Sequence, residues 1–264
     1  MISRIPVWIC LFALSLLAAP CLHAQPAAAA ASSVPRTFRI LSIVGSYEAL
    51  FYQTTADKVS LQAITVTRSL SQPLPAPKGA KLEIFRWVPP PPDAPPGTPP
   101  TRQVALTAML DLNAPESIVV ATPLTPANEQ TLFTPKVIAL TEDDKARTCL
   151  VANLTDFPSA AVSLKETVHT LEPGAVKRVT FEKGHNLLKV AVQIRQNNAW
   201  ALAGDDAWRL NDLYRGYILI LPYMEDPDFP PPLDPPPALV RINFEISPEI
   251  RSQKAAAAAA AAAR

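Results

Sequence analysis

The sequence has 264 residues and carries 24 basic against 23 acidic side chains, which gives a formal net charge of +1. A chain this close to neutrality has no bulk electrostatic attraction to nucleic acid or to an anionic membrane surface. It contains 30 prolines but only 7 glycines, and 48% of its residues are hydrophobic. This composition argues against wholesale disorder and against glycine-rich loops that cradle phosphates.

The first 24 residues have the pattern of an export signal. Arg4 gives a positive start, residues 5–19 form an apolar stretch, and Ala24 is the small residue that signal peptidase requires. The apolar stretch is shorter than the roughly 20 residues that span a bilayer. We therefore expect cleavage after Ala24, and a periplasmic or secreted protein with no transmembrane segment.

A lipoprotein signal with Cys21 as the lipidated residue is the alternative. Pro20 argues against it, because a small residue is expected directly before a lipidated cysteine. Cleavage would remove Arg4 and no acidic residue, so the formal charge falls to 0. One cysteine, Cys149, would remain. Since a single thiol forms no internal disulfide, stability has to come from a hydrophobic core.

The remainder of the chain is a series of short β-rich runs after residues 25–35, which we expect to be a disordered linker. The runs Lys189–Arg195 and Val240–Ile246 alternate between apolar and polar residues, a pattern typical of strands with one face on a core. Tyr217–Leu221 is apolar throughout, as expected for a central strand covered on both faces. The expected strands are 38–44, 59–67 with a bulge near 63–64, 81–88, 103–110, 117–121, 136–140, 147–154, 161–164, 176–181, 188–195, 216–221 and 240–246.

This spacing of strands predicts an all-β fold. We expect two tandem antiparallel β-sandwich (Ig-like) domains, at 36–122 and 131–248, with a single larger sandwich as the alternative. The polar, proline-marked stretch Pro123–Gln130 is the expected boundary. The alanine-rich residues 249–264 are expected to form a tail, because the run is too short to hold a helix alone.

Proline and glycine mark the connections. Pro173-Gly174 predicts a type II turn within residues 171–174, and residues 183–186 are a second turn candidate; both indicate hairpins. Two proline tracts, at 89–100 and 227–237, should adopt polyproline II. They are either docking arms for an aromatic groove or stiff connectors between adjacent strands, and the strand-like runs on both sides favour connectors.

Common catalytic motifs are absent from the sequence. Cys149 lies in an apolar strand candidate, where it would behave as a small buried hydrophobic residue. With His169, His185 and Met224 it could supply the ligands of a blue-copper centre, but both histidines lie downstream of the cysteine and in expected turns. We therefore expect neither a metal nor another cofactor.

Two pairs of acidic residues, Asp143-Asp144 and Asp205-Asp206, are possible functional carboxylates. Glycoside hydrolysis needs two carboxylates that face each other across a sugar, whereas neighbours in a strand point to opposite faces. Solvated turn residues are the favoured interpretation of both pairs, with calcium binding as the weaker alternative.

The candidate contact surface in the second half is an aromatic cluster of Trp200, Trp208, Tyr214 and Tyr217, of which all but Tyr217 are possible contact residues together with Arg209 and Arg215. The tryptophans flank a polar Gly-Asp-Asp stretch, which suggests a hairpin with one indole on each arm. An exposed pair would stack on a sugar ring while an arginine binds its hydroxyl groups. A buried pair would be an aromatic plug between sheets, which is the commoner arrangement in sandwiches.

The second half resembles a family of uncharacterised exported bacterial β-sandwich proteins, and a looser likeness extends into residues 39–88. The segments that carry the resemblance are 147–154, 171–174, 189–194, 208–210 and 215–216. These segments contain turn and core positions, so the resemblance implies a fold and export but no activity, cofactor or site residue. We expect a non-enzymatic structural or interaction module whose partner is another envelope protein. Binding of an envelope polysaccharide through Trp200 and Trp208 is the alternative.

Overall fold

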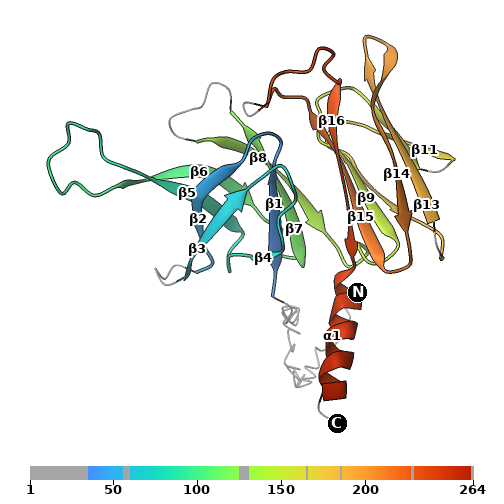
Figure 1. Cartoon of the computed structure of the whole chain (residues 1–264), viewed down its shortest axis with the longest axis horizontal. Helices are drawn as coiled ribbons and strands as arrows, with labels where there is room; N and C mark the ends of the chain where they lie inside the picture. Colours follow the sequence, from blue (N-terminus) through green and yellow to red (C-terminus); the bar gives the residue numbers. More distant parts are fainter. Residues whose placement is uncertain are drawn as a thin grey trace, which may run out of the picture. The chain divides into compact units, whose positions relative to one another are not determined.

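The computed structural model describes residues 35–55, 60–124, 131–164, 166–184, 186–226 and 229–262 (Figure 1). The expected leader and residues 25–34 of the expected linker lie outside these ranges. The described chain is all-β, as predicted. Its strands form four sheets of four strands each, and one helix, α1 (Pro248–Ala262), follows them.

The first half of the chain contains two sheets. One has the order β4-β1-β7-β8, formed by β1 (Thr37–Ser42), β4 (Leu74–Pro75), β7 (Glu116–Pro123) and β8 (Phe133–Leu140). The other has the order β3-β2-β5-β6, formed by β2 (Tyr47–Gln53), β3 (Leu61–Val66), β5 (Lys81–Val88) and β6 (Thr101–Met109).

The second half also contains two sheets. One has the order β12-β9-β15-β16, formed by β9 (Thr148–Asn153), β12 (Val176–Thr180), β15 (Tyr214–Pro222) and β16 (Ala238–Ile246). The other has the order β11-β10-β13-β14, formed by β10 (Ala160–Leu164), β11 (Thr167–Leu171), β13 (Asn186–Gln196) and β14 (Ala199–Leu210).

The two halves have the same topology. Each strand of the first half has an equivalent eight strands later, in the same place in its sheet. The pair β1–β7 is parallel, as is its equivalent β9–β15, and the other strand pairs of the described chain are antiparallel. The chain is therefore a structural duplication of one eight-stranded sandwich.

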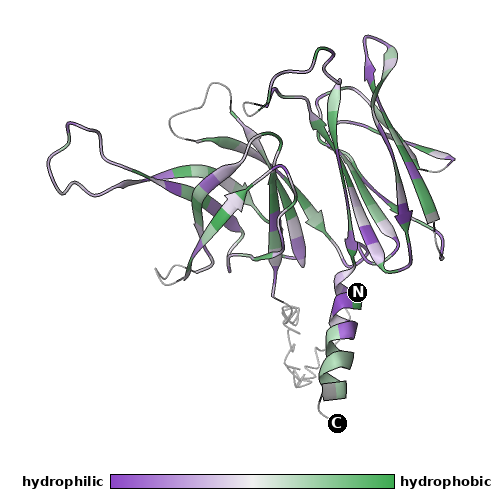
Figure 2. Ribbon diagram, in the orientation of Figure 1, coloured by the Kyte–Doolittle hydropathy of each residue, from purple (hydrophilic) through white to green (hydrophobic). Residues whose placement is uncertain are grey.

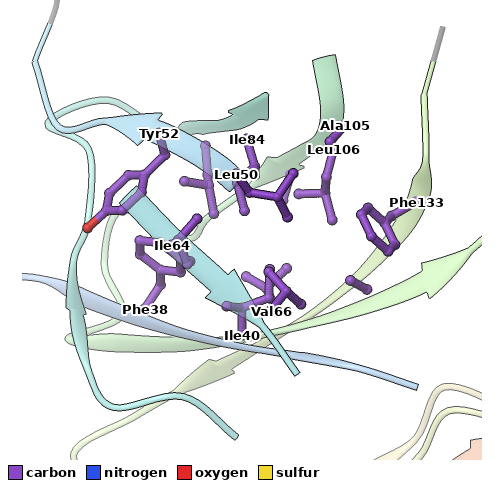
Figure 3. Packing of buried hydrophobic residues seen from close by; sticks show 14 of the residues in the cluster. Phe38, Ile40, Leu50, Tyr52, Ile64, Val66, Ile84, Ala105, Leu106 and Phe133 are labelled. Carbon is purple, nitrogen blue, oxygen red and sulfur yellow. The ribbon is translucent and has the colours of Figure 1, made fainter. Parts of the chain in front are cut away.

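Three hydrophobic clusters lie between the four sheets. The first fills the first sandwich and includes Phe38, Tyr52 and Phe133 (Figure 3). The second fills the other sandwich around Val192 and Ile220. The third lies between the two sheets that contain β1 and β9, so the two sandwiches share a core as well as having their own.

The shared core explains the hydrophobic runs seen in the sequence. Strands β1, β7, β9 and β15 are the central strands of the two sheets that contribute to it, and almost all of their residues are buried. These strands carry apolar residues on both faces, and Figure 2 shows green stretches along them that are interrupted by purple polar positions. The prediction for Tyr217–Leu221 is thus confirmed, because all five residues are buried in β15.

The stretch expected to separate the domains lies inside one sheet. β7 and β8 pair along their full lengths on either side of Pro123–Gln130, of which residues 125–130 lie outside the described chain. β8 therefore belongs to the first sandwich, and the change between the two topologically equivalent halves falls at residues 141–147. Both proline tracts connect adjacent antiparallel strands, β5 with β6 and β15 with β16.

Several local expectations need correction. The type II turn at Pro173-Gly174 is present, with Gly174 at φ 75° and Ala175 N donating to Glu172 O. It joins β11 to β12, which belong to different sheets, so neither it nor the turn before β13 forms a hairpin. The bulge expected near 63–64 lies in the partner strand β2 instead, where the register shifts between Tyr47 and Leu50.

The expected C-terminal tail is a helix in residues 248–262. Its first turn is fixed by Ser247, whose carbonyl accepts hydrogen bonds from Ile250 N and Arg251 N. Glu249 accepts a hydrogen bond of 2.7 Å from Ala146 N, which attaches this turn to the segment that joins the two halves. The alanines extend a helix whose costly first turn is already formed.

Candidate functional site

The hairpin expected around Gly204-Asp205-Asp206 does not form. These residues lie within β14, a single strand of twelve residues. The chain reverses earlier, between β13 and β14, where Asn197 and Asn198 both have positive φ, at 48° and 63°. Asparagine tolerates this conformation in a two-residue hairpin turn, so the Asn-Asn pair is the real turn signal.

A bulge in β14 separates the two tryptophans. Val192 pairs with Gly204 and Gln193 pairs with Leu202, so Ala203 is an extra residue in the strand. Because one inserted residue reverses the alternation of side chains, Trp200 and Trp208 point to opposite faces. Trp208 packs in the second cluster, with its ring centroid 5.3 Å from that of Phe244, whereas Trp200 is 45% exposed.

The remaining predicted contact residues are also dispersed. Tyr214 packs against the second cluster, and Arg215 is only 5% exposed. Arg209 is exposed but stands nine residues from Trp200 along β14, about 30 Å at the usual rise of a strand. One sugar ring could not reach both. Of the five predicted contact residues, Trp200 and Arg209 are the two with exposed side chains.

Arg215 belongs to a closed ring of four charged side chains between the two sandwiches, of which three are buried and Glu245 is half-buried. Its Nη2 lies 2.6 Å from Glu116 Oε2, and its Nε lies 2.8 Å from Glu245 Oε1. Arg39 completes the ring, with its Nε 2.8 Å from Glu116 Oε1 and its Nη2 2.5 Å from Glu245 Oε2. Each guanidinium thus contacts both carboxylates, and β1, β7, β15 and β16 are joined.

The ring is electrostatically balanced. Burial alone would raise the pKa of Glu245, but the ion pairs with Arg39 and Arg215 outweigh it and lower that pKa below its usual value. Burial raises the pKa of Tyr217, whose hydroxyl lies 3.1 Å from Glu245 Oε1. All four charged groups have partners inside the protein, so we assign the ring to the architecture rather than to ligand binding.

A hollow of about 890 Å³ lies at one end of the second sandwich. It is bordered by the segment after β9, by the start of β14, and by the proline segment that leads into β16. Its lining includes Phe157, Leu202, Tyr223 and the segment Asp234–Pro237. The volume is within the range of sites that hold small molecules.

Among the described residues that line this hollow, the charged groups are all carboxylates. Asp234 is exposed and forms no ion pair within the described part of the chain. The Asp156 carboxylate lies 3.5 Å from Lys136 Nζ, but its side chain is 99% exposed and the pair is weakly held. The hollow therefore combines apolar and aromatic side chains with polar ones and an acidic rim, which suits a ligand that carries both apolar groups and a positive charge.

The candidate metal ligands are not brought together. Cys149 is buried in β9, and burial raises the pKa of its thiol to about 12. His169 lies in β11 rather than in a turn, and its Nε2 is buried without a hydrogen-bond partner. His185 lies outside the described residues. Among the residues that the structure does describe, no three His, Cys, Asp or Glu side chains are grouped closely enough to hold a metal.

The acidic pairs have separate structural settings. Asp143 is exposed, whereas Asp144 is buried and lies 2.9 Å from both Nε and Nη2 of Arg178. Asp205 and Asp206 are both exposed, and they lie in a strand rather than in the expected turn. Asp144 is therefore a partner in a structural ion pair.

Sequence reasoning missed the hollow. Phe157 and Tyr223 stand alone in loop segments, and nothing in the residue pattern connects them with β14. The Asn-Asn turn is the one local signal that would have placed Trp200 and Leu202 at the start of an edge strand.

Within the described residues, no helix has both the length and the apolar character needed to cross a membrane. A comparison with protein-family models found no match, and no curated protein matches the chain in sequence.

Proposed function

We propose that this protein is an exported, non-enzymatic interaction module of the cell envelope, and that it contacts its partner at the hollow-bearing end of the second sandwich. Export rests on the leader pattern in residues 1–24. The observation that carries the location is the exposed pair Trp200 and Leu202 on β14, which are 45% and 55% exposed and of which Leu202 lines the hollow.

The architecture supports this location. Three cores and the buried ring of charges hold the four sheets together, so the hollow is presented by a stiff scaffold. A preformed surface loses little conformational freedom when it binds. Exposed tryptophan is also among the side chains that contribute most to protein interfaces.

Site-specific photo-crosslinking in native envelopes tests the proposal. A photoreactive phenylalanine derivative replaces Trp200 in one variant and Trp87 in another. Trp87 is the matched control because it is 46% exposed on β5, in the other sandwich. We expect a discrete crosslinked protein with the position 200 variant and none with the position 87 variant.

Two results would overturn the proposal. One is recovery of free monomer from both variants together with turnover of a substrate by the purified protein. The other is an identical set of adducts at both positions, since that pattern indicates nonspecific contact. Titration with envelope polysaccharides, followed through the fluorescence of Trp200, separates a glycan partner from a protein partner.

A further inference from the structure

We infer that the first four residues of β14, Ala199–Leu202, form a docking edge for an extended peptide, which adds to the sheet as a further strand and places alternate side chains in the hollow. This inference rests on the proposed function and names the chemistry of the partner.

The backbone of β14 supplies the first argument. Among the strands that the structure describes, β14 stands at the end of the order β11-β10-β13-β14 and pairs with β13 alone. An edge strand presents unpaired N–H and C=O groups along one side, and a polypeptide in extended conformation is the ligand that satisfies them.

Protection of this edge is uneven. In native proteins, edge strands are usually protected from pairing with another chain by charges, prolines or bulges. β14 has its bulge at Ala203 and exposed carboxylates at Asp205 and Asp206, which protect its second part. Ala199–Leu202 has no charge and no proline, and it includes two of the large apolar side chains that the protein exposes. Within this unprotected part, Ala201 and Leu202 line the hollow.

The two faces of the edge predict the side-chain pattern of the peptide. Ala201 pairs with Ile194, whose side chain is buried in the second cluster, whereas Trp200 and Leu202 point to the opposite face. In an added strand, one set of alternate residues would lie beside Trp200 and Leu202. The other set would enter the hollow near Phe157 and Tyr223.

Charge complementarity selects the polar residues of the peptide. Among the residues that the structure describes, the hollow is lined by the carboxylates of Asp156 and Asp234 and by no cationic side chain, and Lys136 Nζ lies 3.5 Å from Asp156. A peptide that alternates valine with lysine therefore fits the edge, and one that alternates valine with glutamate is repelled.

Fluorescence anisotropy with labelled synthetic peptides tests the inference on the full-length protein. The probes are an octapeptide of alternating Val and Lys, its Val and Glu counterpart, and a Val and Lys version with every backbone nitrogen methylated. We expect the first to bind at least tenfold more tightly than the second. Methylation should abolish binding, because it removes the N–H donors from both hydrogen-bonding edges of the peptide while it keeps the charge.

Variants locate the binding. Trp200→Ala and Asp234→Asn should each weaken binding of the Val and Lys peptide at least fivefold, while Trp87→Ala leaves it unchanged. Circular dichroism spectra and urea midpoints identify any variant that fails to fold. If Trp200→Ala fails to fold, Asp234→Asn still tests the inference. Equal binding of the methylated peptide, or an equal effect of Trp87→Ala, would overturn the inference.

The inference and the proposed function can fail separately. If no peptide binds but position 200 still crosslinks to an envelope protein, the interaction role stands and strand addition is wrong. If the peptide binds through Trp200 but no partner is captured in envelopes, the edge is real and its assignment to the envelope role fails.

Discussion

Glu116 and Arg215 occupy equivalent positions in the two halves of the chain, and their side chains bind each other. Glu116 is the first residue of β7 and pairs with Thr37 of β1. In the equivalent parallel pair of β15 and β9, Gly216 pairs with Cys149, and Arg215 directly precedes Gly216. The 2.6 Å contact between Arg215 Nη2 and Glu116 Oε2 therefore joins the same site of two copies of one fold.

A second reciprocal contact supports this symmetry. Lys136 in β8 donates to Leu154 O, directly after β9, at 2.6 Å. Arg241 in β16, the equivalent of β8, donates to Ile43 O, directly after β1, at 3.5 Å. Such an exchange is typical of an isologous dimer interface, here contained in one chain. The two sandwiches are thus held together as a pseudo-dimer.

Loss of one arginine from the buried ring should strongly destabilise the protein. Arg215→Met would leave Arg39 as the one buried arginine in contact with both Glu116 and Glu245, so the ring would hold an uncompensated negative charge. We expect the free energy of unfolding to fall by about 3–5 kcal/mol, measured by urea denaturation. Arg251→Met is the matched control, because Arg251 is 42% exposed and 3.4 Å from Glu245; its effect should stay within about 0.5 kcal/mol. Equal losses in both variants would contradict this assignment.

The stabilisation from Glu245 should depend on pH. Its pKa is lowered in the folded protein, so its contribution is complete above the pKa of unfolded glutamate, about 4.3, and is lost as the pH falls through the lower folded value. The difference in stability between the wild type and Glu245→Gln should therefore be constant from pH 7 to pH 5 and shrink toward pH 3. Urea titrations at each pH measure it.

Comparison with the variant isolates Glu245 from other carboxylates. The pKa values of Glu83 and Glu249 are also lowered in the folded protein. Both residues remain in Glu245→Gln, so their pH dependence is common to the two proteins and cancels in the difference. A difference that stays constant down to pH 3 would show that Glu245 carries no net electrostatic stabilisation.

Burial should protect the thiol of Cys149. Because its pKa is raised to about 12, only about one thiol in 10⁴ is ionised at pH 8 even before access is considered. We expect no alkylation by iodoacetamide in the native protein over several hours and complete alkylation in 6 M guanidinium (a concentration of about that order unfolds most domains). Mass spectrometry of the intact protein measures both, and rapid native labelling would indicate that β9 opens.

The all-β class was predictable because strands leave a local signal. β13 and β16 alternate, and β15 is apolar throughout, so the period of the residues indicates both the strand and its burial. The register in which the strands pair depends less on the local sequence. The strand β2 was missed because Glu48 and Ala49 form a bulge that interrupts its alternation, and β14 was interpreted as a hairpin because Gly204-Asp205-Asp206 has a composition typical of turns.

Long-range relationships explain the remaining differences. Glu116 and Arg215 are 99 residues apart, and no local pattern indicates that a charged residue at the end of an apolar strand will meet its opposite in the other half. The duplication is likewise a property of strand order, because equivalent positions carry different residues, such as Phe38 and Cys149 at the second positions of β1 and β9. The docking edge depends on a bulge and on three separate loops.

Gly216 should be intolerant of even one methyl group. A Cβ atom at this position would lie 2.1 Å from Cε1 of Phe244, its partner on β16, so the ring would have to leave its place against Trp208. We expect Gly216→Ala to lower the free energy of unfolding by about 1–3 kcal/mol, the usual cost of overpacking. Gly204→Ala is the control, since a Cβ there meets Val240 at an ordinary 3.4 Å.

A double-mutant cycle tests the assigned cause of that loss. In a Phe244→Ala background the added methyl group meets no ring, so Gly216→Ala should cost less there than in the wild type, by at least about 1 kcal/mol. Urea denaturation of the four proteins gives this coupling energy directly. If the glycine substitution costs the same in both backgrounds, the strain comes from the backbone of β15 and not from the aromatic ring that covers it.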